Sequence, residues 1–297
     1  MASGPDRKRL HARILQWYRR QGRELPWRDL TDPYPVLVSE VMLQQTQVSR
    51  VLLKFPTFMA LFPSLRRLAG ASQRDVVRAW QGMGYNNRAV RLHRLAQLVV
   101  ENHGGNIPDN LPALRSFPGV GKYTAHAMMA FAFRKRVPLV DINVRRVLSR
   151  VLWRISDTAV LKAEEEIWEA AHSLLPSAHT YEWNQALMDL GATICTARAP
   201  KCPACPVNRE CRSSGRIKRS SPRRKRPDPS RKGVPNRVYR GRIVETLRSR
   251  PRGLALHRLG RLIADDFQDA DLRWLSAIVA ALADDGLVRV KGVREST

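Results

Sequence analysis

Four cysteines constrain the fold of this chain most, because all of them lie within seventeen residues. They are Cys195, Cys202, Cys205 and Cys211, and the sequence contains no other cysteine. The spacing C-x6-C-x2-C-x5-C brings four thiolates around one small volume, which suits a [4Fe-4S] cluster and, less well, a tetrahedral zinc ion. Two disulfides are the third alternative, which the lack of any sign of secretion disfavours. The sequence therefore predicts a metal-held loop over residues 195–211.

Charge is the second strong signal. The chain has 297 residues, and its 52 Lys and Arg against 26 Asp and Glu give a net charge of +26. Such an excess predicts a polyanionic partner, nucleic acid first and an anionic membrane surface second. The membrane is disfavoured because no apolar run reaches eighteen residues, and the charged N-terminus lacks the apolar core of a signal peptide. We expect an intracellular protein, cytoplasmic or nucleoid-associated, that does not bind membranes.

The pattern of apolar residues is helical almost throughout residues 7–215, and 43% of the chain is hydrophobic, enough for a sizeable core. This predicts an all-α domain. Expected helical segments cover residues 35–55, 72–80, 87–102, 123–133, 144–151, 162–175 and 183–195. Between residues 216 and 232, nine of seventeen residues are Lys or Arg among Pro and Ser, which predicts a flexible basic linker over 216–236.

A different order of elements follows the linker. Helical spacing over 238–248, 257–267 and 272–284 precedes a strand-like run at 286–290. This order resembles a small winged-helix domain of α+β type over 237–292, with a plain helical cap as the alternative.

Two further motifs carry chemistry. Phe117-Pro118-Gly119-Val120-Gly121 joins two helical segments, and glycines at such a turn let the backbone approach a partner while the next helix offers its N–H groups to a phosphate. About twenty residues later comes Val140-Asp141-Ile142-Asn143-Val144-Arg145-Arg146, and the cysteine loop follows some fifty residues after that.

In this order, the hairpin, the aspartate and the cysteine loop resemble the helix-hairpin-helix DNA glycosylases with an iron-sulfur cluster, the superfamily that includes endonuclease III. The resemblance covers roughly residues 10–212. It implies a two-lobed helical core over 7–215 with the active cleft between the lobes, and a [4Fe-4S] cluster bound by the four cysteines.

Within that superfamily the chain is most similar to the adenine DNA glycosylases of the MutY type. The matching runs are Leu25-Pro26-Trp27-Arg28, Ser39-Glu40-Val41-Met42-Leu43-Gln44-Gln45-Thr46-Gln47-Val48, Trp80-Gln81-Gly82-Met83-Gly84-Tyr85 and Asn184-Gln185-Ala186-Leu187-Met188-Asp189-Leu190-Gly191-Ala192. The similarity implies a monomeric base excision repair enzyme. Its substrate would be double-stranded DNA in which adenine is mispaired with guanine or 8-oxoguanine.

The resemblance also assigns roles to residues. Glu40 would be the general acid, in a partly apolar pocket that raises its pKa, and Asp141 the carboxylate that stabilises the sugar cation. The expected DNA and substrate contacts are Gln44, Gln45, Tyr85, Gly119, Gly121, Lys122, Tyr123 and Asn143. Gln44, Gln45 and Tyr85 would form the wedge that fills the gap left by the flipped base, and Asn143 would place water or a phosphate.

Tyr123 bears on reaction type and on base choice. Superfamily members that also nick DNA carry a lysine nucleophile at this place, so Tyr123 predicts a monofunctional glycosylase. Thymine and uracil mismatch enzymes can carry tyrosine there, so an enzyme for thymine, uracil or hypoxanthine stays open as an alternative. A third, less favoured possibility is a DNA-binding iron-sulfur protein without catalysis, which the presence of both Glu40 and Asp141 disfavours.

Overall fold

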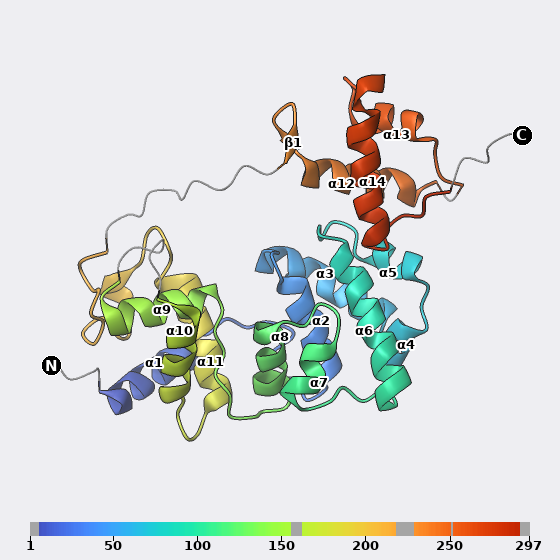
Figure 1. Cartoon of the computed structure of the whole chain (residues 1–297). Coiled ribbons are helices and arrows are strands. Elements are labelled where there is room, and N and C mark those ends of the chain that lie inside the picture. Colours follow the sequence, from blue (N-terminus) through green and yellow to red (C-terminus); the bar gives the residue numbers. More distant parts are fainter. Residues whose placement is uncertain (1–5, 156–161, 218–228, 251, 292–297) are drawn as a thin grey trace, which may run out of the picture. The chain divides into compact units, whose positions relative to one another are not determined.

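The computed structural model describes residues 6–155, 162–217, 229–250 and 252–291 (Figure 1). Contacts between Cα atoms divide the chain into two compact units, each made of two separate stretches. The first combines Met1–Glu40 with Ile107–Arg224, and the second combines Val41–Asn106 with Lys225–Thr297. Residues 156–161 of the expected core, 218–228 of the expected linker, and 251 and 292 of the expected winged helix lie outside the described residues. In the described ranges, no helix has both the length and the apolar composition needed to cross a bilayer.

The first unit is helical, as the apolar spacing predicts. Its helices are α1 (Arg7–Gln21), most of α2 (Pro33–Leu43), α7 (Leu111–Ser116), α8 (Lys122–Ala127), α9 (Ile142–Trp153), α10 (Glu164–Ser173) and α11 (Thr180–Asp189), with a 3₁₀ turn at Cys202–Ala204. Short polar side chains mark several starts, because their oxygens accept otherwise unpaired N–H groups. Asp6 accepts from the N–H of Lys8 at α1, and Asn110 accepts from that of Ala113 at α7.

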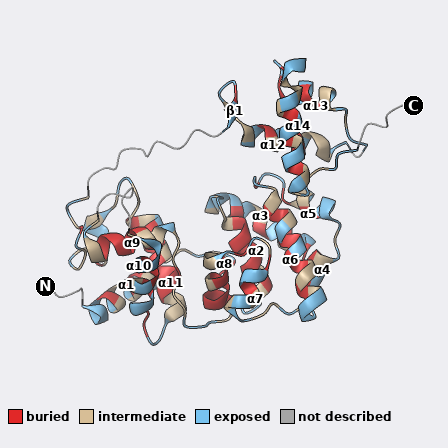
Figure 2. Cartoon of the chain, viewed as in Figure 1, coloured by how far each residue is buried: buried red, intermediate tan, exposed pale blue. Residues whose placement is uncertain are grey.

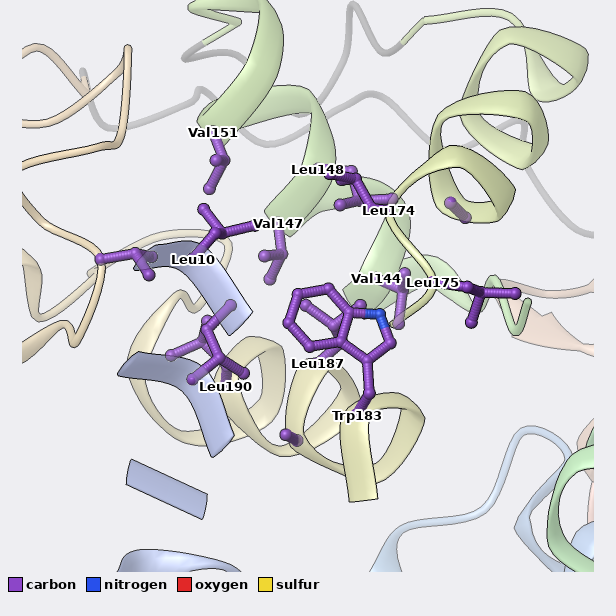
Figure 3. Close-up of a cluster of buried hydrophobic side chains, with 14 of the residues drawn as sticks. Leu10, Val144, Val147, Leu148, Val151, Leu174, Leu175, Trp183, Leu187 and Leu190 are labelled. Carbon is purple, nitrogen blue, oxygen red and sulfur yellow. The ribbon is translucent and has the colours of Figure 1, made fainter. Parts of the chain in front are cut away.

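Helices α1, α9, α10 and α11 enclose a hydrophobic core. Trp183 of α11 is 1% exposed and lies among Leu10, Val144 and Leu148, as Figure 3 shows. The buried faces of these helices appear red in Figure 2. Cys195, Cys205 and Cys211 pack against the same cluster, so the cysteine loop rests on the core of this unit.

Two of the expected helices end earlier than their apolar spacing predicts. Helix α8 gives way to a π-helical turn at Met128–Ala132, and α11 to another at Leu190–Ile194. A π turn inserts an extra residue per turn and often lies at a functional site. Gly191 lies in the second one, and its backbone lies against Asn143 near the start of α9, which Asp141 caps.

The second unit holds the remaining elements. They are the last residues of α2, then α3 (Val48–Leu61), α4 (Leu65–Ala69), α5 (Gln73–Ala79), α6 (Asn87–His103), β1 (Ser230–Arg231), β2 (Val234–Pro235), α12 (Asn236–Arg248), α13 (Leu256–Ile263), a 3₁₀ turn at Asp269–Asp271 and α14 (Leu272–Asp284). Helices α12, α13 and α14 share a core that includes Tyr239, Ile243 and Leu275.

Two sequence expectations are wrong in this unit. The helix expected over 35–55 is broken into α2 and α3, because Gln45 takes a left-handed conformation with φ of 55°. The strand expected at 286–290 does not form in the described chain. Leu287 and Val288 pack on the apolar core there, while β1 pairs only with β2 in a short antiparallel hairpin.

A buried ion pair fastens the N-terminal segment to α11. Asp189 is fully buried, and its carboxylate accepts hydrogen bonds from Arg28 at 2.7 and 2.9 Å and from Arg23 at 2.8 Å. Burial raises the pKa of Asp189, but the hydrogen bonds from Arg28 and Arg23 outweigh that effect and hold it below its usual value. The carboxylate is therefore stable inside the protein only with its arginines.

We expect Asp189→Asn to lower the free energy of unfolding by about 3–5 kcal/mol, because it leaves the buried Arg28 guanidinium without its counter-ion. Glu182→Gln is the matched control, since Glu182 pairs with Arg19 of α1 at the exposed edge of the same helix. It should cost less than about 1 kcal/mol. Urea unfolding at pH 7 measures both, and equal losses would contradict this assignment.

Candidate active site

Glu40 lies near the end of α2 and is only 5% exposed, so the expected burial of this carboxyl group is confirmed. The phenol of Tyr123 donates a hydrogen bond to it from α8. The other oxygen, Oε2, is buried and has no hydrogen-bond partner in the protein. A buried carboxyl oxygen without a partner is costly, and it is available to a proton or a ligand.

The surroundings of Glu40 favour its protonated form. Burial raises the pKa of Glu40 to about 7, the nearby charge of Asp141 adds to this, and the hydrogen bond from Tyr123 works in the opposite direction. The group is thus half protonated near neutral pH. A carboxyl group tuned in this way can act as a general acid.

Asp141 caps the start of α9. Its Oδ1 accepts the N–H of Val144 at 2.6 Å, and its Oδ2 accepts the side-chain amide of Asn143 at 2.7 Å. Burial raises the pKa of Asp141, and these two hydrogen bonds act against the rise. The carboxylate is therefore held in one orientation beside the positive end of a helix.

Arg146 connects this carboxylate to the cysteine loop. Its guanidinium donates to Oδ1 of Asn143 at 2.8 Å, to the carbonyl of Gly191 at 2.6 Å and to the carbonyl of Cys195 at 2.7 Å. The amide of Asn143 thus spans Arg146 and Asp141. Sequence reasoning placed Asn143 against water or a phosphate and missed Arg146, although its spacing of three residues from Asn143 on a helix is a usable signal.

Gly191 must be a glycine for this arrangement to form. A Cβ atom built on it would lie 2.6 Å from Cβ of Asn143 and 3.1 Å from its Cα. No side chain fits at that distance without moving Asn143. The close approach lets the carbonyl of Gly191 reach Arg146.

The four cysteines are free thiols, so the disulfide alternative is not realised. They line one pocket, whose other walls include Val147, Leu190 and Val207. Arg150, 1% exposed, donates to Sγ of Cys195 at 3.3 Å and to the carbonyl of Thr196 at 2.7 Å. In the described part of the chain, no three or more His, Cys, Asp or Glu side chains are grouped to hold a single metal ion.

The hairpin before α8 has the conformation that its glycines suggest. Gly119 has φ of 82°, a left-handed value that favours glycine, and Gly121 precedes the first turn of α8. Lys122 does not join Glu40. Its Nζ lies 4.3 Å from the centre of the Trp168 ring and 4.0 Å from the carboxylate of Glu164.

The expected wedge residues belong to the second unit. Gln44 and Gln45 follow α2, and Tyr85, which is 49% exposed, precedes α6. Gln45 and Tyr85 both have left-handed backbones, with φ of 55° and 44°. Arg88, buried at 6% exposure, lies between the two turns and donates to backbone carbonyls of both.

Comparisons with known proteins agree with this geometry. Residues 38–173 match the model of the HhH-GPD superfamily base excision DNA repair proteins. The chain is 44% identical over 197 residues to the adenine DNA glycosylase of Mycobacterium tuberculosis, a match that covers 66% of this chain and 64% of that protein. It is 41% identical over 214 residues to the human adenine DNA glycosylase, covering 69% and 39%. The chain thus spans less than two thirds of the length of either relative.

Two solved structures have a similar fold. A thermostable thymine-DNA glycosylase is 32% identical with a TM-score of 0.65, and the match covers 70% of this chain and 96% of that one. A complex of endonuclease III with DNA has a TM-score of 0.59 at 19% identity, covering 70% and 96%, which supports the fold alone. With 32% identity across nearly the whole of the first structure, the chain belongs to the HhH-GPD superfamily of base excision DNA repair proteins.

Proposed function

We propose that this chain is a monofunctional DNA glycosylase of base excision repair that removes adenine mispaired with guanine or 8-oxoguanine. The observation that carries the proposal is the pair of carboxyl groups in the first unit, the buried Glu40 with its raised pKa and the half-buried Asp141 fixed at a helix start. The adenine DNA glycosylases that are 44% and 41% identical support the choice of base.

The proposed reaction adds water across the bond between the base and C1′ of the deoxyribose. The target nucleotide must first leave the stack, because that bond is out of reach inside a duplex. Glu40 gives its proton to N7 of the purine, so that adenine leaves neutral, and Asp141 stabilises the positive charge on the sugar. Water then forms a bond to C1′, and the water molecule loses one proton to a Brønsted base. The products are free adenine and an abasic site.

The monofunctional assignment rests on Tyr123 and Lys122. Tyr123 hydrogen-bonds to Glu40 and has no amine with which to form a Schiff base. Lys122, the adjacent lysine, lies over Trp168 and beside Glu164. We therefore propose hydrolysis without strand cleavage.

A second candidate base is favoured by a specific observation. The structure that is 32% identical is that of a thymine-DNA glycosylase. Tyr123 is compatible with either substrate, so thymine, uracil or hypoxanthine opposite its partner base is the alternative on the same scaffold. A purely DNA-binding role would leave the raised pKa of Glu40 without a use.

The cysteine loop fits a [4Fe-4S] cluster. Four thiols line one pocket with apolar walls, which suits a group of several atoms better than a lone ion. Cys195, Cys202, Cys205 and Cys211 would bind it, and the cluster would supply a covalent cross-link of the loop rather than electron transfer, since hydrolysis needs none. Arg146 and Arg150 both contact Cys195, so these two side chains would connect the cross-linked loop to α9.

We also propose that the partner is double-stranded DNA bound by a monomer inside the cell, as the net charge of +26 supports. The proposed organisation is a glycosylase core over 7–215, a basic linker over 216–236 and a C-terminal helical segment over 237–292.

The first test is a single-turnover panel on duplexes with A opposite 8-oxoguanine, A opposite G, T opposite G, U opposite G and hypoxanthine opposite T. We expect alkali-labile sites at adenine, and intact strands when the alkali step is left out. Release of thymine, uracil or hypoxanthine instead would refute the choice of adenine and support the alternative substrate. Release of no base would refute catalysis.

The pH dependence tests Glu40 as the acid. Because its pKa is raised to about 7, the protonated form declines above that pH. The single-turnover rate should therefore be flat below pH 6 and fall about tenfold per pH unit above pH 8. Glu40→Gln should remove base release at every pH, and a profile that rises above pH 8 would contradict an acid role.

Asp141→Asn tests the second carboxyl group. Asparagine can keep the hydrogen bond from the N–H of Val144 but carries no charge, so the sugar cation loses its stabilisation. We expect duplex affinity within about threefold of the parent and a rate lower by at least about 100-fold, as for other lost electrostatic contacts in active sites. Gel-shift titration and single-turnover assays on the same preparation separate the two. A parallel fall of both would reassign Asp141 to folding.

A further inference from the structure

We propose that the C-terminal helices position the Tyr85 turn, residues 80–86, and that Arg248 is the residue through which they do so. The inference rests on the proposed function, to which we add the proposal that Tyr85 helps to fill the gap left by the flipped base, as the family resemblance implies. It goes beyond that function by giving the C-terminal segment a part in base removal.

The Tyr85 turn needs outside support. Tyr85 has a left-handed backbone, which is unfavourable for a bulky residue and persists only where neighbours enforce it. Its ring is 49% exposed, so the packing of the ring itself supplies only part of that support. The shape of the turn therefore depends on hydrogen bonds to its backbone and flanking side chains.

Arg88 supplies support from α6, which directly follows the turn. Its guanidinium donates to the carbonyls of Met83 at 3.2 Å and Gly84 at 3.1 Å, and also to those of Val41 and Met42 at 2.9 Å each. It also lies 5.8 Å from the centre of the Tyr85 ring. Burial lowers the pKa of Arg88 to about 10, so it is still a cation at neutral pH. The turn is thereby tied to the end of α2.

Arg248 supplies support from the C-terminal segment. It is the last residue of α12, and its side chain is 11% exposed. The guanidinium donates to the carbonyls of Val77 at 2.9 Å and Arg78 at 3.3 Å, and to Oδ1 of Asn86 at 3.3 Å. The two carbonyls lie in the last turn of α5, which a cation stabilises, and Asn86 directly follows Tyr85. One side chain thus connects the end of the helix before the turn to Asn86, the last residue of the turn.

Other contacts keep α12 and α14 at this place within the second unit. Gln81, inside the turn, donates to the carboxylate of Glu245 on α12. Gln73 at the start of α5 donates to the carbonyl of Gly286 after α14. Val77 packs against the apolar core of the C-terminal helices. The hydrogen bonds of Arg248 are therefore part of a set of contacts between the C-terminal helices and the region around α5.

A positioning role differs from phosphate binding in what it changes. A phosphate contact alters DNA affinity and the slope of log affinity against log salt. A residue that sets the wedge alters the rate at which a bound duplex loses its base and leaves that slope unchanged. The side chain of Arg248 is mostly buried, and its guanidinium is hydrogen-bonded to the protein. We therefore assign it a positioning role rather than phosphate binding.

The test compares Arg248→Ala with Arg250→Ala in the full chain. Arg250 is exposed, and its side chain donates to the carbonyl of Thr246 and to Oγ of Ser249 beside it, so its loss removes the same charge without removing a contact to the turn that the structure describes. Hydrogen exchange followed by mass spectrometry on residues 77–88 should become faster in Arg248→Ala alone. The single-turnover rate on the duplex that the panel identifies should fall about tenfold, the effect of one lost charged hydrogen bond, with an unchanged salt slope.

A double-mutant cycle with Tyr85→Ala links the effect to the turn. In that background, Arg248→Ala should cost less than about twofold, because the wedge is already lost. Should Arg248→Ala fail to fold, Gln81→Ala removes the contact to Glu245 from the exposed side and should produce the same faster exchange.

Unchanged exchange over 77–88 in both variants, or full additivity with Tyr85→Ala, would overturn the proposal. A changed salt slope with a normal rate would reassign Arg248 to phosphate binding. The exchange measurement needs no catalysis. If the chain released no base while exchange still responded to Arg248→Ala alone, the proposed function would fail but the support of the turn by α12 would stand.

Discussion

The hydrogen bonds of Arg146 are the interaction on which the chemistry of the first unit depends. One guanidinium binds Asn143, the carbonyl of Gly191 and the carbonyl of Cys195, residues that stand far apart in the sequence. Because Asn143 in turn binds Asp141, the orientation of this half-buried carboxylate is coupled to the placement of the cysteine loop. Any shift of the loop at Cys195 would be transmitted to Asp141 through three hydrogen bonds in series. A structural group in the loop could therefore influence a hydrolytic reaction without touching the substrate.

Burial, which raises the pKa of both carboxyl groups, is the second feature that the proposed chemistry needs. Glu40 and Asp141 both have raised pKa values for the same first reason, loss of water, but their partners differ. Asp141 accepts two strong donors that favour its charge, whereas Glu40 has one phenol and an oxygen without a partner. Environment thus separates two chemically similar groups, which fits the proton-donor and charge-stabiliser roles proposed for them. The charge of Asp141 itself helps to keep Glu40 protonated.

Sequence reasoning identified the parts of the site but not the bonds that join them. The cysteine spacing, the aspartate at a helix start and the glutamate within an apolar helix are local patterns, and each lies where its pattern suggests. Arg146 and Arg88 were missed because the contacts that make them important, from Arg146 to Cys195 and from Arg88 to Val41, span more than forty residues. No local period reports such contacts, and the short spacing between Arg146 and Asn143 does not reveal them. Gly191 was noticed only within a matching run, since its close approach to Asn143 depends on a π turn that apolar spacing does not predict. The strand expected at 286–290 failed for the opposite reason: its local pattern is good, but no second strand lies beside it in the described chain.

The same arginines change how the net charge should be interpreted. A value of +26 suggests that all the excess charge faces a polyanion. Yet Arg88, Arg146 and Arg150 are each less than 9% exposed and donate mainly to backbone carbonyls, while Arg28 and Arg231 are buried against carboxylates. These cations stabilise helix ends and turns and are out of reach of a phosphate. The charge available to the proposed DNA partner is therefore smaller than composition implies, and part of the basic character of the chain maintains the fold around Glu40, Asp141 and Tyr85.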